Sequence, residues 1–218
     1  RHRRIACSTA AGPAFEGAKI HCGMRGAQGA IDHVSLESGR LRCSVIGGGT
    51  AAGLCGSGLL DAVACALDAG LIDPSGRMDT SAGAPEQWTQ AGSLKALRLQ
   101  DDIVLTQKDV REVQLAKSAI RAGIELMARH LGSTPDDIQA VYLAGAFGNY
   151  LDPASACRIG LIPPYLLSKI IPVGNAAGSG VKMAAVSKAA MARAEQLAAT
   201  TEFLELASLP EFQDEYVD

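Results

Sequence analysis

The sequence has no surplus of charge of either sign and no long hydrophobic run. Its 20 Lys and Arg residues stand against 23 Asp and Glu residues, and the basic residues are scattered along the chain. Without a basic patch there is little to attract a phosphate backbone, so nucleic acid is excluded as an expected partner. The longest apolar stretch, residues 59–72, is interrupted by Asp61 and Asp68 and is shorter than the roughly 20 residues that a membrane span requires. We therefore expect no membrane segment, and no stretch has the features of a signal peptide.

Cysteine is present, but without the spacings that bind metals. The sequence contains neither C-x-x-C nor the ferredoxin-type C-x4-C-x2-C pattern, which excludes a zinc ribbon or an iron-sulfur cluster built from this stretch alone. His21, Cys22 and His33 do not suggest a metal site either, because adjacent residues point to different sides of an element. A chain of this length does not need disulfides, so we expect reduced thiols in a cytoplasmic protein. The six cysteines are Cys7, Cys22, Cys43, Cys55, Cys65 and Cys157.

An initiator methionine is also missing, since the chain begins with Arg1. We expect a fragment or a processed chain. With 218 residues, 48% of them hydrophobic and 20% charged, the composition is that of a globular protein that buries roughly 70% of its unfolded surface. We predict one domain over residues 1–218, with a loop-rich insertion at 73–93 where Pro and Gly recur.

Hydrophobic periodicity predicts strands interleaved with helices, and hence an α/β fold with a mixed sheet flanked by helices. Thr106 and Asp109 form a capping-box pattern before the longest helical stripe, and Gly132 follows as its stop. The expected strands are residues 4–8, 30–36, 41–46, 97–105, 140–144 and 169–173. The expected helices are residues 15–24, 59–71, 110–131, 184–197 and 202–206, with a short one from residue 153.

Three glycine-rich turns, within residues 47–58, 145–149 and 174–180, each follow an apolar strand and precede a helix. Glycine lets the backbone approach a ligand closely, and a helix N-terminus offers unpaired N–H groups to an anion. The phosphate-loop motif G-x-x-x-x-G-K-S/T is absent, and the partial dinucleotide fingerprint at 47–52 is followed by glycines where its helix would have to start. The CGSG sequence at 55–58 is interpreted as a tight turn of small residues, because no histidine is spaced to act as a base.

The second and third turns follow one another in an informative order. Residues 141–148 (VYLAGAFG) are followed by residues 172–180 (PVGNAAGSG) and an alanine-rich helix. This order resembles the adenosine motif and the second connecting motif of the superfamily that contains acetate and sugar kinases, heat-shock chaperones and actin. Upstream, residues 10–17 (AAGPAFEG) take the place of the loop after the second phosphate hairpin. The resemblance implies a ribonuclease H-like half-domain of the actin-like ATPase fold.

Four longer motifs span most of the chain. They are residues 7–18 (CSTAAGPAFEGA), 105–117 (LTQKDVREVQLAK), 143–152 (LAGAFGNYLD) and 173–178 (VGNAAG). Together they resemble the C-terminal ATPase-like domain of the reductive activators of corrinoid proteins. In that family an N-terminal two-iron ferredoxin domain supplies an electron, and ATP helps to return cob(II)amide to cob(I)amide. The resemblance thus implies ATP with Mg²⁺ as cofactor and a corrinoid protein of a methyltransferase system as partner.

The sequence departs from that family in one respect. Members carry a phosphate hairpin with the sequence Asp-Ile-Gly-Thr in each half of the domain, and neither occurs here. Residues 1–8 resemble the strand after the second hairpin. We therefore expect the second half-domain, with the ferredoxin cluster and the phosphate-binding hairpins in missing upstream sequence. Phosphoryl transfer depends on positioned charge around the γ-phosphate, so we predict that the 218-residue chain alone does not hydrolyse ATP.

The candidate site residues follow from the matched motifs, and they include no catalytic residue and no metal ligand. The resemblance places Gly145, Gly148 and Asn149 along the adenosine. Gln114 and Lys117, one helical turn apart, are predicted to face the ribose, with a solvated helix face as the alternative. The full set predicted to bind the nucleotide is Gly12, Glu16, Gln114, Lys117, Gly145, Gly148, Asn149, Gly174, Asn175 and Gly178.

Two alternatives for the parent protein remain open from the sequence. One is a small-molecule kinase of the same superfamily, which would carry the hairpins without ferredoxin cysteines. The other is a non-catalytic module whose glycine turns are structural and whose segment 73–93 docks a corrinoid protein. Substitution of Gly148 by Val in the full-length protein would separate them, because lost ATP binding with intact docking favours an enzyme.

Overall fold

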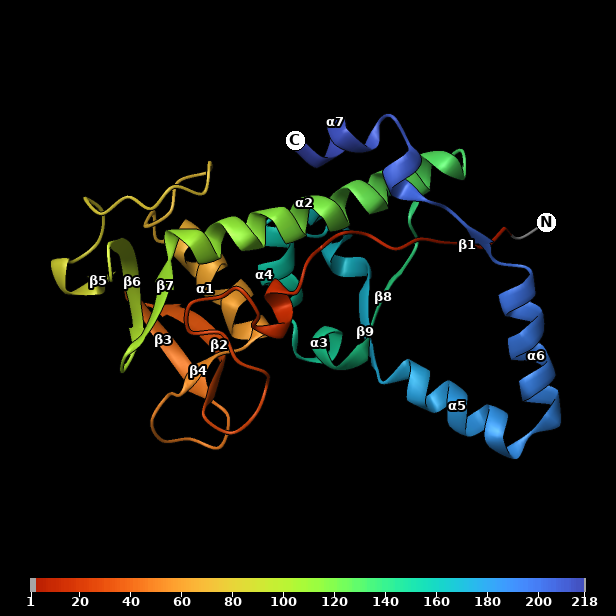
Figure 1. Cartoon of the computed structure of the whole chain (residues 1–218), viewed down its shortest axis with the longest axis horizontal. Coiled ribbons are helices and arrows are strands. Elements are labelled where there is room, and N and C mark those ends of the chain that lie inside the picture. The colour runs from red at the N-terminus through yellow and green to blue at the C-terminus, as the bar shows by residue number, and fades with distance from the viewer. Residues whose placement is uncertain (1–2, 218) are drawn as a thin grey trace.

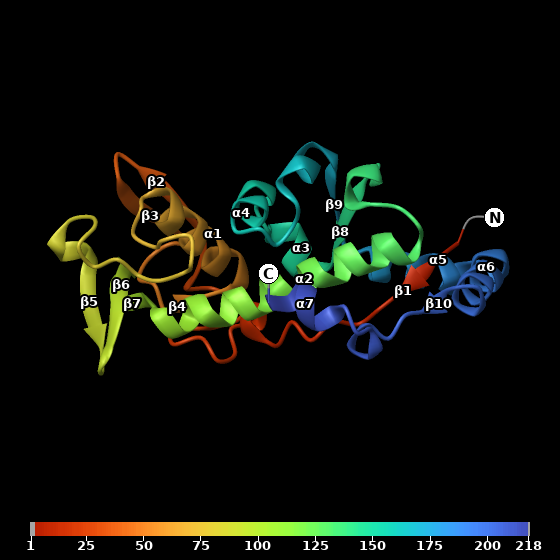
Figure 2. The ribbon, with the colours of Figure 1, turned by 90° about the horizontal axis from the view of Figure 1, so that it is seen from above.

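The computed structural model describes residues 3–217, except for the side chains of Ala146, Asn149 and Val217. The molecule is elongated, and the 24-residue helix α2 (Gln107–His130) runs along much of its length (Figures 1 and 2). Within the described residues the strands form four small sheets rather than one, with the orders β3-β2-β4, β5-β6-β7, β8-β9 and β1-β10. Helices lie between and beside these sheets, in the mixed α/β architecture that the sequence predicts.

The first sheet is built on a hairpin that the sequence predicts correctly. β2 (Ala30–Glu37) and β3 (Arg40–Val45) pair antiparallel, and β4 (Gly53–Leu54) adds parallel to β2. Ser38 and Gly39 form the turn with φ angles of 51° and 77°, the left-handed region that a tight hairpin turn requires. Helix α1 (Gly56–Asp68) packs on β2 and buries most of its residues.

The second sheet differs from the prediction of one strand over residues 97–105. The structure has a hairpin instead, formed by β6 (Leu94–Gln100) and β7 (Ile103–Thr106). Asp101 makes the turn at a φ of 51°, and its Oδ2 accepts a 2.8 Å hydrogen bond from the N–H of Ala51. The hydrophobicity pattern does not reveal this turn, because the residues on both sides of it are apolar and look like one continuous strand.

Helix α2 begins with the predicted capping box. Thr106 Oγ1 accepts a hydrogen bond from the Asp109 N–H at 3.2 Å, and Asp109 Oδ2 accepts from the N–H and the hydroxyl of Thr106, each at 2.8 Å. The other oxygen of Asp109 accepts from the N–H of His21 at 2.8 Å. Asp109 is completely buried, and a buried carboxylate is tolerated when donors surround it in this way. The cap therefore also fixes the loop around residue 21 against the start of α2.

The prediction of a helix over residues 15–24 is wrong. Only one 3-10 turn forms there, η1 (Ala14–Glu16). Gly17 follows with a φ of 82° and Lys19 with a φ of 64°, which ends any helix. A Cβ added at Gly17 would lie 2.7 Å from the backbone nitrogen of Met24, so the chain folds back closely on itself in this segment.

Two parallel strand pairs form the other end of the molecule. β8 (Val141–Ala144) pairs with β9 (Ile170–Gly174), and β1 (Ile5–Ala6) pairs with β10 (Glu202–Phe203). Between β8 and β9 the chain forms α3 (Gly145–Tyr150), α4 (Pro153–Arg158) and the 3-10 helix η4 (Pro164–Lys169). In the described part of the chain each pair has only two strands, so both leave unpaired edges.

Several short elements differ from the sequence-based expectations. The predicted helix 184–197 is two helices, α5 (Ala176–Val186) and α6 (Lys188–Ala199), because Ser187 caps the second one. The predicted helix 202–206 is wrong, since β10 occupies its start. The elements that the sequence did not predict include β4, α3 and η4 as well as η2 (Pro85–Gln87), β5 (Trp88–Ala91), η3 (Pro135–Asp137), η5 (Leu206–Ser208) and α7 (Phe212–Val217).

The main core lies between α1, the two three-stranded sheets and the N-terminal half of α2, where Leu59, Leu97 and Leu105 are almost completely buried. A smaller cluster joins Phe212 of α7 to Leu126 of α2. None of the described residues of α5 and α6 is buried. No helix in residues 3–217 has the length and apolar character needed to cross a membrane.

Candidate functional site

Two of the predicted glycine turns meet in space. Because β8 and β9 run parallel, with Ala144 paired to Gly174, the turns that follow them lie at the same end of the pair. Gly145 has a φ of 90° and Gly174 a φ of 62°, conformations that glycine adopts without strain. The predicted turn 145–149 is helical, because α3 starts at Gly145, and the predicted turn 174–180 is helical from Ala176, where α5 starts. The ends of β8 and β9 and the starts of these two helices form one corner, which we call the glycine corner.

The loop around η1 reaches the same neighbourhood through an aromatic contact. The ring of Phe15 stacks on that of Phe147 in α3, with centroids 4.9 Å apart and planes inclined by 11°. A Cβ added at Gly56 would lie 2.2 Å from the Phe15 carbonyl oxygen, so the start of α1 touches this loop as well. The contact brings the segment of Gly12 and Glu16 beside the glycine corner.

Three of the predicted residues have clear structural roles at the corner. The side chain of Asn175 caps α5, with Oδ1 accepting from the N–H of Gly178 at 2.8 Å. A Cβ at Gly178 would lie 2.6 Å from Asn175 Nδ2, and one at Gly148 would lie 3.2 Å from the carbonyl carbon of Leu143. Packing therefore explains why glycine stands at positions 148 and 178. The side chain of Asn149 lies outside the described residues.

Gln114 and Lys117 contact other segments. Gln114 Nε2 donates to the carbonyl oxygen of Ser75 at 3.0 Å, and a Cβ added at Gly160 would lie 3.4 Å from Lys117 Nζ. Both side chains line a small cavity of about 60 Å³ between α2 and the loop around Gly76. Their role at the ribose stays a prediction.

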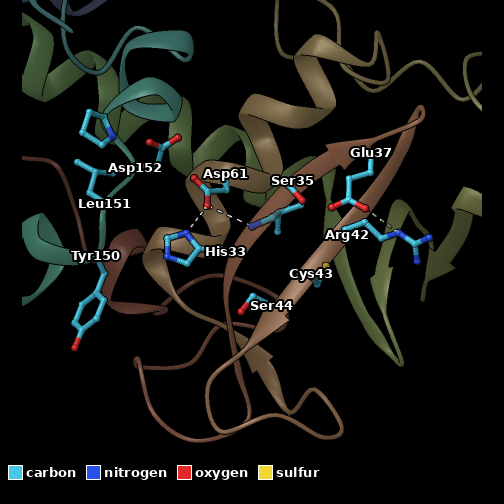
Figure 3. Close-up of a pocket in the computed structure, with 12 residues that line it drawn as sticks. His33, Ser35, Glu37, Arg42, Cys43, Ser44, Asp61, Tyr150, Leu151 and Asp152 are labelled. Atoms are coloured by element: carbon cyan, nitrogen blue, oxygen red, sulfur yellow. Dashed lines mark hydrogen bonds and ion pairs between the residues drawn. The ribbon is translucent and has the colours of Figure 1, made fainter. Parts of the chain in front are cut away.

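A larger pocket of about 720 Å³ opens between the first sheet and the end of α3 (Figure 3). One wall comes from β2, β3 and α1, and the other from the residues that join α3 to α4. Figure 3 shows the wall formed by the sheet and α1 facing the wall formed by residues 150–152. Its volume falls in the range of about 300–1,000 Å³ that is usual for small-molecule sites. The polar residues that line it include His33, Ser35, Ser44, Asp61, Tyr150 and Asp152.

A histidine and a buried carboxylate form the polar centre of this pocket. His33 Nδ1 lies 3.0 Å from Asp61 Oδ2, which also accepts from the N–H of Val34 at 3.3 Å. The Asp61 side chain is 4% exposed and that of His33 is 49% exposed. Burial raises the pKa of Asp61, against the lowering effect of its hydrogen bonds. The carboxylate is therefore hidden behind a ring that reaches solvent.

The sequence patterns do not reveal this pocket, although one signal for it is present. Asp61 interrupts the apolar stripe of α1, and a charged residue in a buried helix needs a partner. In the sequence, His33 stands out only as a candidate metal ligand with His21 and Cys22. The hairpin prediction places His33 on β2 but gives no register against α1, so the pairing required the structure.

A family model described as the C-terminal domain of RACo, the ASKHA domain, matches residues 1–218. The corrinoid activation enzyme RamQ of Eubacterium limosum is 38% identical over 227 residues, which cover 96% of this chain and 38% of that protein. The Co(II) methylated amine-specific corrinoid protein reductase of Methanosarcina barkeri is 32% identical over 200 residues, which cover 79% of this chain and 33% of that protein.

A solved structure of a reductive activator for corrinoid, iron-sulfur protein is similar in fold as well as in sequence. Its TM-score is 0.89 at 35% identity, and the match covers 98% of this chain and 35% of that one. The actin-like fold expected from the sequence is thus confirmed. The chain spans only between 33% and 38% of the length of these three proteins.

Proposed function

The chain belongs to the family of C-terminal ASKHA domains of RACo, and from this premise we propose that it is the nucleotide-binding half-domain of an ATP-dependent reductive activator. The parent protein would return cob(II)amide to cob(I)amide in a corrinoid protein of a methyltransferase system, in the cytoplasm. The names of the similar proteins, which are those of corrinoid activators and a corrinoid protein reductase, favour this activity over a small-molecule kinase.

The observation that carries the nucleotide part of the proposal is the glycine corner. Two strand-turn-helix units place Gly145 and Gly174 side by side, and the η1 loop adds a third segment. A Cβ added at Gly145 would meet nothing within 4 Å, so the space in front of this turn is open. Backbone without a side chain in the way lets a ligand approach closely, which suits the adenosine that lies along this motif in the superfamily that the sequence resembles.

The unpaired sheet edges support the proposal of a half-domain. A groove of about 650 Å³ lies between β1 and β8, and its lining includes the apolar side chains of Ile124, Met127 and Leu131 on α2. A β-hairpin seated in this groove would join β1-β10 and β8-β9 into one sheet and would cover α2. We attribute it to a phosphate hairpin encoded outside this sequence, as the partial coverage of the related proteins suggests.

The residues present do not fit a metal site. Within residues 3–217 there is no group of three or more His, Cys, Asp or Glu side chains arranged to hold a metal ion. A two-iron cluster would therefore depend on other parts of the parent protein. For this chain we propose nucleotide binding and positioning, without a catalytic residue.

The structure also changes the experiment that tests nucleotide binding. Gly148→Val would push a side chain into Leu143 and disturb folding. Gly145→Asn is a better test in the full-length protein, because its added side chain points into open space. Gly49→Asn is the matched control, since Gly49 has a φ of 84° and equally open surroundings in the loop after β3. We expect the Gly145 variant to lose ATP affinity and the Gly49 variant to keep it. Equal affinity in both variants would contradict the proposed site.

A further inference from the structure

The pocket around His33 contains a buried carboxylate oxygen without a donor. Oδ1 of Asp61 has no hydrogen-bond partner among the described residues, and the Asp61 side chain is only 4% exposed. The other oxygen, Oδ2, is paired with His33 and with the N–H of Val34. A buried carboxylate oxygen that lacks a donor costs free energy, and bulk water does not reach this one. The missing donor therefore has to come from a group that enters the pocket.

A second carboxylate lies close to the first. Asp152 accepts hydrogen bonds from the N–H groups of Ala154 and Ser155 at 3.2 and 3.1 Å, and from the Ser155 hydroxyl at 3.0 Å. Burial raises the pKa of Asp61, while the same Ser155 hydroxyl lies near enough to lower it. Asp152 is thus supplied with donors and Asp61 is not. Two carboxylates on either side of one hydroxyl repel each other unless a proton or a cation compensates.

The lining of the pocket is acidic whatever the charge of His33. Its carboxylates are Glu37, Asp61 and Asp152, and Glu37 is paired with Arg42 across the hairpin at 3.7 Å. Asp61 and Asp152 are then left with at most one positive charge, that of His33, so the pocket attracts cations. No group of three His, Cys, Asp or Glu side chains among the described residues is arranged to hold a metal ion. The charges therefore favour an organic cation.

The wall opposite the hairpin suits a flat cation. Tyr150 is 58% exposed there, and Figure 3 shows its ring on the side of the pocket away from β2 and β3. Ser35 and Ser44 add hydroxyl groups to the lining. A guanidinium group is planar, carries five N–H donors and no acceptor, and stacks on aromatic rings. It therefore matches a pocket that offers a carboxylate oxygen, hydroxyl oxygens and an aromatic face.

We propose that this pocket binds a guanidinium group, with Asp61 Oδ1 accepting a hydrogen bond from one of its N–H donors and Tyr150 stacking on its plane. The site is separate from the glycine corner and does not depend on nucleotide binding. A small molecule and an arginine side chain of a partner protein carry the same group, and the experiment below separates these two sources.

The first test is a calorimetric titration of the full-length protein with n-butylguanidinium and with n-butylurea. The urea has nearly the same shape, but it is uncharged and has an oxygen acceptor in place of an N–H donor. We expect the guanidinium to bind at least about tenfold more tightly, the usual effect of a hydrogen bond to a charged group. Equal affinity for the two compounds, or no binding of n-butylguanidinium, overturns the proposed site.

Two variants locate the binding in this pocket. Asp61→Asn keeps the size of the side chain and an acceptor for Val34, and it should weaken n-butylguanidinium binding about tenfold or more. Asp68→Asn is the matched control, because Asp68 is exposed on the same helix and paired with Arg158, and it should bind as the wild type does. Unchanged affinity in Asp61→Asn overturns the site.

The second variant, Tyr150→Ala, changes an exposed residue and leaves the core intact. It should weaken n-butylguanidinium binding a few-fold, the usual contribution of a cation to an aromatic face at an exposed position. Unchanged affinity in Tyr150→Ala contradicts the stacking contact.

The source of the guanidinium group has its own measurement. The affinity of the full-length protein for its corrinoid partner is determined with and without saturating n-butylguanidinium. A loss of affinity identifies an arginine of the partner as the occupant, and an unchanged affinity identifies a small molecule. This measurement alone rests on the proposed function. The direct titration needs neither ATP nor the corrinoid protein, so its failure and the failure of the proposed function are distinguishable.

Discussion

At the scale of single residues, the structure separates glycines that serve packing from those that border open space. Gly56 and Gly58 let α1 approach the backbone of η1 and β2, which explains the CGSG sequence as a close-packing feature. The glycine motifs of the candidate site could be found in the sequence because they are local. The His33–Asp61 pair could not, because it depends on the register between β2 and α1.

The packing role of Gly58 gives a stability prediction. A Cβ at this position would lie 2.3 Å from the carbonyl oxygen of Ile31, so Gly58→Ala should lower the free energy of unfolding by about 1–3 kcal/mol or more. Gly180→Ala in α5 is the control, because nothing lies within 4 Å of its added Cβ, and it should stabilise the helix by about 0.5–1 kcal/mol. Urea unfolding measures both values, and two variants of equal stability would contradict the packing argument.

Two cysteines lead to a prediction about reactivity. Burial raises the pKa of both the Cys43 and the Cys65 thiol to about 11, from an ordinary value of 9.0. At pH 8 the thiolate fraction of each is then roughly 100-fold lower than in the unfolded chain. Alkylation followed by mass spectrometry should show both sites reacting much more slowly in the native protein than in urea. Native rates within a few-fold of the unfolded rates would disagree with this prediction.

At the scale of elements, strong local sequence signals were sufficient to predict a helix or a strand, and weak ones were not. The capping box and the long apolar stripe identified α2, and the hairpin of β2 and β3 was predicted with its turn. β10 and β5 escaped prediction because each is short and is held by a strand that sequence periodicity cannot pair with it. A helix was wrongly predicted at residues 15–24 because apolar residues there have helical spacing. In the structure these residues do not share one face of a helix.

The capping box of α2 can be tested directly. Thr106→Ala removes the acceptor for the Asp109 N–H and one donor to the buried Asp109 carboxylate. The cost should be about 1–2 kcal/mol of unfolding free energy, at the upper end for an N-cap. Thr134→Ala is the matched control, because Thr134 caps only the exposed turn η3. If chemical denaturation shows an equal loss of unfolding free energy in both variants, the buried cap has no special role.

At the scale of the whole molecule, the chain has a hydrophobic core of its own, but two of its sheets have unpaired strand edges. The two parallel strand pairs and the exposed helices α5 and α6 form the end of the molecule that lacks burial. The sequence lacks both phosphate hairpins, but it gives no sign that these strands and helices are exposed. How the sheets are separated in space could not be predicted, because it depends on contacts with α2.

The half-domain proposal predicts an absence of turnover. The 218-residue chain provides no phosphate hairpin and no metal-ligating cluster within its described residues, so it should not hydrolyse ATP. A steady-state phosphate-release assay on the purified chain measures this, with the full-length protein as the positive control. Turnover by the purified chain at the rate of the full-length protein would contradict the proposal.

The central claim is that the parent protein uses ATP to reactivate a corrinoid protein. The most direct measurement mixes the full-length protein, its corrinoid partner in the cob(II) state and an electron donor, and follows cob(I)amide by its absorption spectrum with and without ATP. The account predicts cob(I)amide formation that requires ATP and that Gly145→Asn abolishes while Gly49→Asn does not. Formation at the same rate without ATP, or no formation under either condition, would contradict it.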